Sequence, residues 1–227
     1  MKILVIDVGG TNLKLGLSGS RRRVKIPSGL EMTPTRMVAA VRKATVGWKY
    51  TVVSIGYPGP VRNGRPVAEP KNLGRGWVRF NYSEAMGKPA RVVNDAAMQA
   101  LGSYQGRKML FLGLGTGLGS AMVAPSILEP LELAHLPYRK GHTYEDYLGL
   151  RGLTRLGLRR WRAHVHRVVA LFQHALQVDY VMLGGGNAAK LGPVPRGVRR
   201  TANSAAIAGG IRLWEHQRLV PAPGKRV

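Results

Sequence analysis

The 227-residue sequence contains no cysteine. Disulfide bonds and thiolate metal sites are therefore excluded, and the composition fits a reducing compartment. Acidic residues are also scarce, since 11 Asp and Glu face 35 Lys and Arg and leave a formal net charge of +24. Such a field attracts polyanions and speeds their arrival, so nucleic acid, an anionic membrane surface and inorganic polyphosphate are all candidate partners.

Long apolar runs are missing as well. The run that follows Met1 and Lys2 is too short for a signal peptide or a membrane helix, which predicts a cytoplasmic protein with no membrane segment. Hydrophobic residues make up 44% of the chain, as in an ordinary globular protein. A chain of this length can bury a core in one large or two small domains.

The segment over residues 3–14 predicts a buried strand, a tight glycine turn and a second strand over residues 13–17. Glycine permits close backbone approach to a phosphate, and successive N–H groups form an anion-binding concavity. Asp7 ends the first strand and points into the same space, so a cation is needed between its carboxylate and a phosphate. Mg²⁺, bound to Asp7 directly or through water, is the economical choice. A hairpin whose glycines only serve the turn is the alternative. The predicted phosphate-binding residues are Asp7, Gly9, Gly10, Thr11, Asn12 and Lys14.

Residues 108–119 repeat the first pattern. The correspondences pair Lys2 with Lys108, Leu4 with Leu110 and Gly9 with Gly115. Two such hairpins half a chain apart predict a duplicated α/β fold with two phosphate loops that face one cleft. The pair resembles the phosphate-1 and phosphate-2 loops of the superfamily of sugar kinases, Hsp70 and actin, with its ribonuclease H-like, actin-like ATPase fold. The motifs below resemble the ROK family within it, and especially its polyphosphate-glucokinase-like members. The second loop then implies donor binding by Gly115, Thr116 and Gly117.

A strand over residues 90–93 runs into Asn94 and Asp95, and a helix follows over residues 96–104. Taken alone, a carboxylate at this junction caps the helix. The run Val-x-Asn-Asp-Ala, however, resembles the ROK catalytic segment. That resemblance implies that Asp95 is the general base and that both Asn94 and Asp95 contact the sugar.

Three further segments resemble sugar-binding motifs of the family. Asn72 matches the Asn of a Pro-Asn-Leu segment, although Lys71 interrupts the motif and a plain turn is the alternative. Glu132 and His135 match a Glu-x-Gly-His motif in which Ala134 replaces glycine. Glu145 matches a later sugar-binding Glu, while Asp146 is expected to be a helix-start charge. Many relatives hold zinc through cysteines after the His; this chain has none, so we expect no zinc.

The remaining elements complete a two-domain prediction. A basic amphipathic helix over residues 155–176 has an apolar face at Val165, Val168, Val169, Phe172 and Leu176. A strand over residues 179–183 then enters a glycine turn, which in the family meets the adenosine side of the nucleotide through Gly184, Gly185 and Gly186. We predict an N-terminal α/β domain over residues 1–105 and a C-terminal one over residues 106–227. A last helix at about residues 202–214 is expected to return to the first domain, and residues 217–227 to form a basic tail.

The resemblance implies a kinase that transfers a phosphoryl group from polyphosphate, ATP or both to the 6-hydroxyl of glucose, with Mg²⁺. Two alternatives stay open: an ATP-dependent kinase for another hexose, such as fructose or an N-acetylated hexosamine, and a non-catalytic polyanion-binding regulator. The chain shows no helix-turn-helix pattern, so specific nucleic-acid binding is not expected. The sequence also leaves a homodimer open.

Overall fold

The computed structural model describes residues 1–201 and 204–215, which divide into two compact α/β units. The first unit comprises Met1–Gly102 and the described residues from Ala206 onward, and the second comprises Ser103–Ala205. The observed division therefore falls a few residues before the predicted boundary at 105. The predicted tail over residues 217–227 lies outside the described residues.

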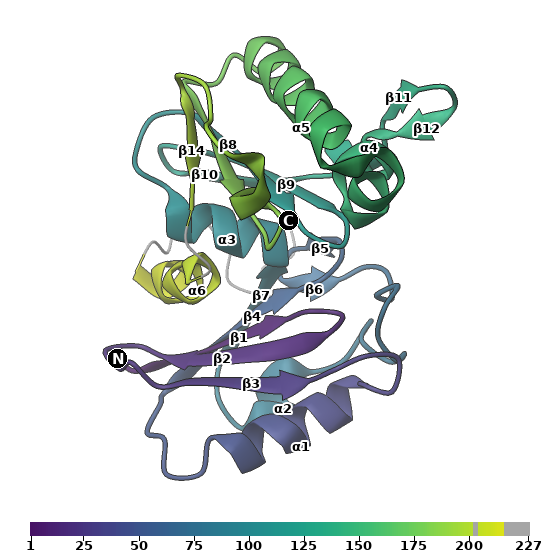
Figure 1. Cartoon of the computed structure of the whole chain (residues 1–227). Coiled ribbons are helices and arrows are strands. Elements are labelled where there is room, and N and C mark those ends of the chain that lie inside the picture. Colours follow the sequence, from purple (N-terminus) through teal and green to yellow (C-terminus); the bar gives the residue numbers. More distant parts are fainter. Residues whose placement is uncertain (202–203, 216–227) are drawn as a thin grey trace. The chain divides into compact units, whose positions relative to one another are not determined.

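The first unit is built on a five-stranded sheet in the order β3-β2-β1-β4-β7 (Figure 1). The strands β1, β4 and β7 are parallel, and β2 and β3 extend the sheet in antiparallel fashion. The helices α1 and α2 lie on one face, and α3 and α6 lie on the other (Figure 1). The bounds are β1 (Ile3–Val8), β2 (Asn12–Leu17), β3 (Arg23–Pro27), α1 (Pro34–Ala44), β4 (Val52–Tyr57), α2 (Tyr82–Met86), β7 (Ala90–Asn94), α3 (Asp95–Ser103) and α6 (Ala205–Glu215).

Alternation along β1 explains how its two faces are covered. Leu4, Ile6 and Val8 join the core that includes residues of α1 and α2, because successive strand side chains point to opposite faces. On the other face Val5 packs against Gly210 of α6 so closely that a β-carbon there would collide with it. Ser54 of β4 donates a hydrogen bond to the Gly210 carbonyl and accepts one from Trp214 Nε1 at 2.9 Å. Helix α6 therefore completes the first unit.

The second unit repeats the arrangement with a five-stranded sheet in the order β10-β9-β8-β13-β14. Its main helix α5 buries Val165, Val168, Val169 and Phe172 of the predicted apolar face, whereas the predicted Leu176 is the partly buried C-cap. The helix also buries Trp161, which was not predicted. The helix begins earlier than the sequence predicts, and Gly157, with φ 73° and ψ 161°, interrupts its regular geometry. The bounds are β8 (Met109–Leu114), β9 (Leu118–Ala124), β10 (Ile127–Leu131), the short 3-10 helix η1 (Leu133–His135), α4 (Tyr144–Leu148), α5 (Leu150–Ala175), β13 (Tyr180–Gly184), the 3-10 helix η2 (Ala188–Leu191) and β14 (Val198–Arg200).

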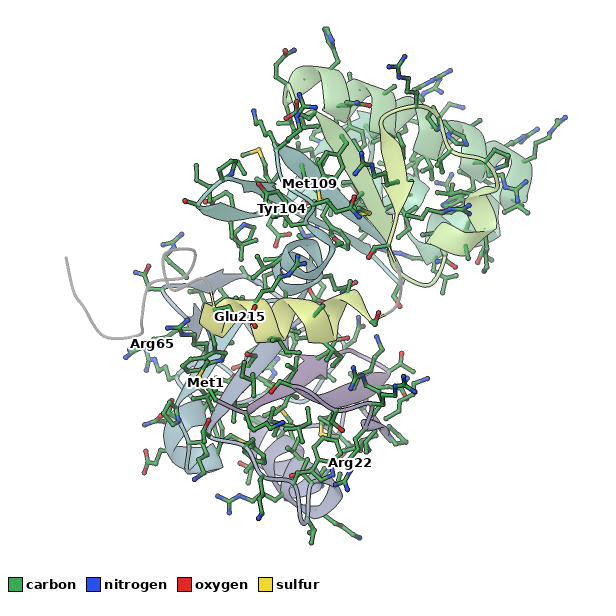
Figure 2. The ribbon with its side chains drawn as sticks, turned by 90° about the vertical axis from the view of Figure 1, so that its left-hand side faces the viewer. Met1, Arg22, Arg65, Tyr104, Met109 and Glu215 are labelled. Atoms are coloured by element: carbon green, nitrogen blue, oxygen red, sulfur yellow. The ribbon has the colours of Figure 1, made fainter. Side chains whose placement is uncertain are left out.

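Two small hairpins complete the described elements: β5 (Val61–Arg62) with β6 (Arg65–Pro66), and β11 (Pro137–Arg139) with β12 (His142–Thr143). Asn63 and Gly64 both have positive φ, at 50° and 71°, which is the geometry that an Asn-Gly hairpin turn requires. Among the helices described here, none combines the length and the apolar character that a membrane crossing needs. Nitrogen-tipped Lys and Arg side chains project from both units (Figure 2).

Candidate functional site

The predicted phosphate-1 loop connects β1 to β2 and is held by its own backbone and by one serine. The Gly9 N–H donates to the Asn12 carbonyl at 3.1 Å. Ser28, just after β3, donates through its hydroxyl to the Gly9 carbonyl at 2.6 Å, and its N–H donates to the Thr11 carbonyl at 2.9 Å. Ser28 was not predicted from the sequence, because nothing local marks it as a partner of a loop 19 residues away.

Asp7 lies directly opposite Lys14 in the β1–β2 ladder. Its carboxylate is buried, at 4% residue exposure, and its Oδ2 accepts a hydrogen bond from Lys14 Nζ at 3.1 Å. The ion pair accounts for a charge that would otherwise be costly to bury. The part of the chain that the structure describes contains no group of three His, Asp or Glu side chains able to ligate a metal by themselves. This donor set fits Mg²⁺ only when one carboxylate, waters and the phosphates of a donor share the ion, which is how Mg²⁺ usually binds.

Asn94 and Asp95 lie where β7 gives way to α3. The Asn94 side chain accepts a hydrogen bond from the Ala97 N–H at 3.0 Å and donates to the Gly59 carbonyl at 3.1 Å. Asn94 is therefore the residue that caps α3, and it also fixes the turn after β4. Asp95 is partly exposed, and its Oδ1 accepts from the Ala96 N–H at 2.8 Å. That contact holds the carboxylate at the carboxyl end of the sheet.

The segment that carries Asn72 folds over the phosphate-1 loop. A β-carbon placed on Gly10 would lie 2.8 Å from Asn72 Cβ, so only glycine allows this approach without displacement. The exposed Asn72 therefore shares a surface with the loop. The segment is anchored by Glu69, whose carboxylate accepts from the N–H groups of Gly76, Trp77 and Val78 at 3.0–3.2 Å. The sequence analysis missed Glu69, since a lone Glu before a Pro carries no distinctive signal.

Two tyrosines near Glu69 have raised pKa values. Tyr57 donates its hydroxyl to the Ala68 carbonyl at 2.7 Å, next to the residue that anchors the segment. Burial raises the pKa of the Tyr57 phenol, and the nearby Glu69 carboxylate raises it further. Burial likewise raises the pKa of Tyr82, which donates to the Trp77 carbonyl at 3.0 Å. Both phenols stay protonated at neutral pH and donate hydrogen bonds to the backbone on either side of the Asn72 segment.

The predicted phosphate-2 loop, in the second unit, is held from three elements. Asn187 Nδ2 donates to the Gly115 carbonyl at 3.1 Å, and the Leu150 N–H at the start of α5 donates to the Thr116 carbonyl at 3.2 Å. The third anchor is Glu145 of α4, whose Oε2 accepts from the Leu118 N–H at 3.1 Å. A β-carbon on Gly115 would meet no atom within 4 Å, so the loop leaves open space beside that residue.

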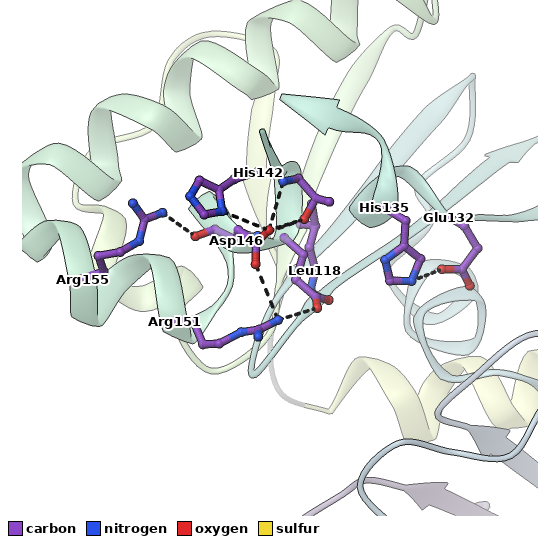
Figure 3. A network of polar contacts seen from close by, with 9 residues as sticks. Leu118, Glu132, His135, His142, Asp146, Arg151 and Arg155 are labelled. Carbon is purple, nitrogen blue, oxygen red and sulfur yellow. Dashed lines mark hydrogen bonds and ion pairs between the residues drawn. The ribbon is translucent and has the colours of Figure 1, made fainter. Parts of the chain in front are cut away.

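Glu145 is thus bound to the phosphate-2 loop, and its carboxylate occupies the space that a Gly117 side chain would need. Its Oε1 also lies 3.5 Å from Arg151, which reaches Asp146 Oδ1 at 3.6 Å (Figure 3). Asp146 serves as the predicted helix-start charge, because it forms a capping box with Thr143. The Thr143 hydrogen bonds lower the pKa of the Asp146 carboxyl, and Arg151 adds to this.

Glu132 and His135 form a separate pair, away from the Asp146 network (Figure 3). Glu132 Oε2 lies 3.6 Å from His135 Nε2, and both side chains are more than half exposed. Ala134 between them is buried in the core of the second unit and does not have positive φ. The replacement of glycine by Ala134 therefore imposes no backbone strain on this motif.

The predicted adenosine-side turn follows β13 and packs against the phosphate-2 loop. Gly185 has φ 81° and lies against the Leu114 backbone, so it accepts no side chain. The Asn187 N–H donates to the Leu114 carbonyl at 2.9 Å. Asn187, which was not predicted from the sequence, therefore joins the two loops through both its backbone and its side chain.

Each unit thus gathers one set of predicted site residues. The first unit brings together the phosphate-1 loop with Asp7, Lys14, Asn72, Asn94 and Asp95. The second unit contains the phosphate-2 and adenosine-side loops with Glu132, His135 and Glu145. In the first unit Asp7 and Asp95 lie at the carboxyl ends of β1 and β7, on either side of β4, which is the edge where open α/β sheets bind ligands.

Comparison with known proteins finds similar sugar kinases. No protein-family model matches the chain. It is 31% identical over 140 residues to the N-acetylmannosamine kinase of Escherichia fergusonii, a match that covers 55% of this chain and 48% of that protein. The chain thus spans about half the length of the curated relatives it matches.

Solved structures match over nearly the whole chain. The inorganic polyphosphate/ATP-glucomannokinase from Arthrobacter sp. strain KM superposes with a TM-score of 0.79 at 23% identity, over 94% of this chain and 98% of that one. A ROK-family glucokinase from Streptomyces griseus, in complex with glucose and AMPPNP, gives a TM-score of 0.73 at 18% identity, over 94% and 99% of the two chains. The α/β fold is therefore the one that these sugar kinases share, the actin-like ATPase fold, as predicted, and the chain is similar to ROK-family sugar kinases.

Proposed function

We propose that this chain is a sugar kinase that transfers a phosphoryl group to the 6-hydroxyl of glucose or a close hexose. The observation that carries the proposal lies within the first unit, where Asp7 and the phosphate-1 loop at the end of β1 and Asp95 at the end of β7 lie at one sheet edge, with β4 between these two parallel strands. A base and a phosphate cradle at one edge suit the reaction, because phosphoryl transfer depends mainly on positioning and charge stabilisation.

In this mechanism the Asp95 carboxylate accepts the proton of the sugar hydroxyl as its oxygen attacks the phosphorus. The Ala96 N–H holds the carboxylate in place. The N–H groups of the phosphate-1 loop and of residues 115–117 bind the donor phosphates, with Thr11, Asn12 and Lys14 at the rim of the first loop. Asp7 is the residue that would hold Mg²⁺, through water or directly, and the ion would neutralise charge on the phosphates.

The sugar is proposed to contact Asn72, Asn94, Asp95, Glu132, His135 and Glu145. Asn94 Oδ1 accepts from the Ala97 N–H, and one Nδ2 hydrogen is donated to the Gly59 carbonyl. The second Nδ2 hydrogen is left to donate to a sugar hydroxyl. The adenosine side of a nucleotide donor would meet Gly184, Gly185 and Gly186. Polyphosphate is proposed as a donor beside ATP, supported by the net charge of +24.

The direct test is Asp95→Asn. Loss of a general base should lower kcat by about 10²–10⁴ while sugar affinity stays within a few-fold of the wild type. Turnover is measured by product formation and sugar affinity by calorimetry. The Arg159→Ala variant, on the exposed surface of α5, is the control for general damage. Wild-type turnover in Asp95→Asn would remove Asp95 as the base.

Phosphorylation of an N-acetylated hexosamine is the second candidate, supported by the sequence match to N-acetylmannosamine kinase. A panel of glucose, mannose, fructose and N-acetylmannosamine, each assayed with ATP and with long-chain polyphosphate in nucleotide-free buffer, separates the candidates. We expect glucose 6-phosphate with both donors. Product from N-acetylmannosamine and ATP alone would replace the glucose proposal, and product from no sugar would contradict both.

A further inference from the structure

A basic groove lies in the first unit at the sheet edge opposite Asp7 and Asp95. It has a volume of about 470 Å³ and is lined by four cations and two aromatic residues, namely Lys2, Arg42, Lys49, Lys88, Trp48 and Tyr50. Lys2 precedes β1, and Lys88 lies just before β7, so the groove follows the amino ends of the parallel strands. Neither the motifs nor the proposed reaction uses these residues.

The charge in this groove is uncompensated. Within the described part of the chain, no carboxylate lies within 4.0 Å of any of the four cationic groups, and the groove lining contains no acidic residue. Of these four side chains, only Arg42 donates a hydrogen bond within the described residues, to the Ala85 carbonyl at 2.7 Å. Like charges gathered in a concave site concentrate their field, so the groove attracts a multivalent anion more strongly than a flat surface does.

The backbone that carries part of this lining is held by turns. Lys49 follows a turn in which Gly47 has φ 77° and the Trp48 N–H donates to the Thr45 carbonyl at 2.9 Å. Lys88 follows the left-handed Gly87 that ends α2, and its N–H donates to the Ser83 carbonyl at 3.2 Å. Trp48 and Tyr50 pack partly against the core. A backbone that is already ordered loses less conformational entropy on binding than a flexible one, which favours affinity.

We propose that this groove binds a linear chain of phosphates, either inorganic oligophosphate or the triphosphate of a nucleotide, at a site separate from the predicted phosphate loops. Phosphate chains match four clustered cations, and the volume lies in the range of small-ligand sites. The two aromatic side chains offer a surface on which a base stacks when the ligand is a nucleotide. The proposal concerns binding and does not depend on the sugar kinase reaction.

The test uses Trp48 as the reporter, because it is one of only four tryptophans in the chain. The full-length protein is titrated with tripolyphosphate, ATP and adenosine without Mg²⁺ or sugar, and the emission of the Trp48→Phe variant is subtracted. We expect saturable changes with tripolyphosphate and ATP and none with adenosine. Equal affinities assign the site to the phosphate chain alone, and tighter ATP binding assigns it to a nucleotide.

Two matched double variants then test the groove itself. Lys49→Ala/Lys88→Ala should weaken binding about tenfold, whereas Arg159→Ala/Arg160→Ala, which removes the same charge from an exposed part of α5, should change it less than twofold. Lys49→Gln/Lys88→Gln replaces the first pair if circular dichroism shows damage to its fold. Equal weakening in both double variants, or no saturable signal, would overturn the proposal.

Sugar turnover of the same variants separates this proposal from the proposed function. At saturating donor we expect turnover within twofold of the wild type, since none of the groove residues lies in the proposed machinery. Failure of the kinase assay with an intact titration would contradict only the proposed function. An absent titration with normal turnover would contradict only the groove.

Discussion

The two predicted phosphate loops look alike in sequence but differ in how they are built. On their first strands Asp7 corresponds to Gly113, by the same offset that pairs Gly9 with Gly115. On the second strands the correspondence slips by one residue, because residues 9–12 separate Val8 from Leu13, whereas only residues 115–117 separate Leu114 from Leu118. The ladder pair Asp7–Lys14 of the first hairpin is therefore replaced by Gly113–Gly119 in the second.

The first hairpin is therefore charged, whereas the second is uncharged and is held by residues of other elements. The first hairpin contains its own buried carboxylate and ion pair and is supported by nearby strand residues. The turn of the second contains no charged side chain. It is held by hydrogen bonds with Glu145, Asn187 and the first residue of α5. Both hairpins place a glycine-rich turn between two apolar strands, but the turns differ in length and in charge, and the first hairpin is the one suited to a cation.

The largest effect is expected when the charge of the first loop is removed. Asp7→Asn keeps the shape of the side chain but removes the carboxylate that would hold the cation, so kcat should fall by about 10²–10³. The second hairpin provides the contrast, because its corresponding position is already Gly113. Steady-state kinetics across a Mg²⁺ titration make the measurement. Unchanged turnover and unchanged Mg²⁺ dependence would show that the two loops do not differ in this role.

A smaller effect should distinguish braced from open positions within the second loop. Gly117→Ala must displace the Glu145 carboxylate and lose its hydrogen bond to Leu118, which should lower the free energy of unfolding by about 1–2 kcal/mol. Gly115→Ala places its methyl group in open space, so stability should stay unchanged while the donor KM rises. Denaturant unfolding and donor kinetics on both variants check this. Equal stability losses would contradict the distinction.

The smallest effect concerns pH and separates the two units. The described part of the first unit contains no histidine, whereas the second unit holds His164 against Tyr138, whose hydroxyl lies 3.0 Å from its Nδ1. Burial lowers the pKa of His164, and Arg139, Arg167 and Arg155 lower it further. Its stabilising contribution is therefore complete above its ordinary pKa of 6.5 and is lost as the pH falls below that value.

His164→Phe keeps the aromatic packing and removes the titration. Between about pH 7 and 5.5, the melting temperature of the variant should fall less with decreasing pH than that of the wild type. His174→Phe, which replaces an exposed histidine on the same helix, is the control that should leave the slope unchanged. Identical slopes in the wild type and both variants would exclude His164 as a source of acid sensitivity.

The sequence predicted the parts of this molecule that local pattern controls. The two hairpins and the apolar face of α5 follow from residue periodicity and turn chemistry. The capping role at the β7–α3 junction was assigned to Asp95 as the alternative to catalysis, but the structure gives it to Asn94. The assignment of the cap depends on whether α3 begins at residue 95 or 96, and sequence alone does not locate a helix start to one residue.

Long-range supports could not be predicted in the same way. Glu69, Asn187 and Ser28 each hold a loop through contacts that depend on the finished fold, and no local spacing marks them. The one-residue slip between the hairpins was also invisible, because both turns are rich in glycine and their first strands align without a gap. The early start of α5 was missed because Gly152 and Gly157 weaken the helical pattern.

Helix α6 has a consequence for how the protein is made. The first unit lacks part of the cover for one face of its sheet until α6, which follows the second unit in the chain, has left the ribosome. The second unit is contiguous in sequence and has all its strands and helices before that moment. Most of the first unit is synthesised before the second, yet the second is complete earlier. The Ser54, Arg91 and Val5 surfaces that receive α6 stay uncovered in the nascent chain until then.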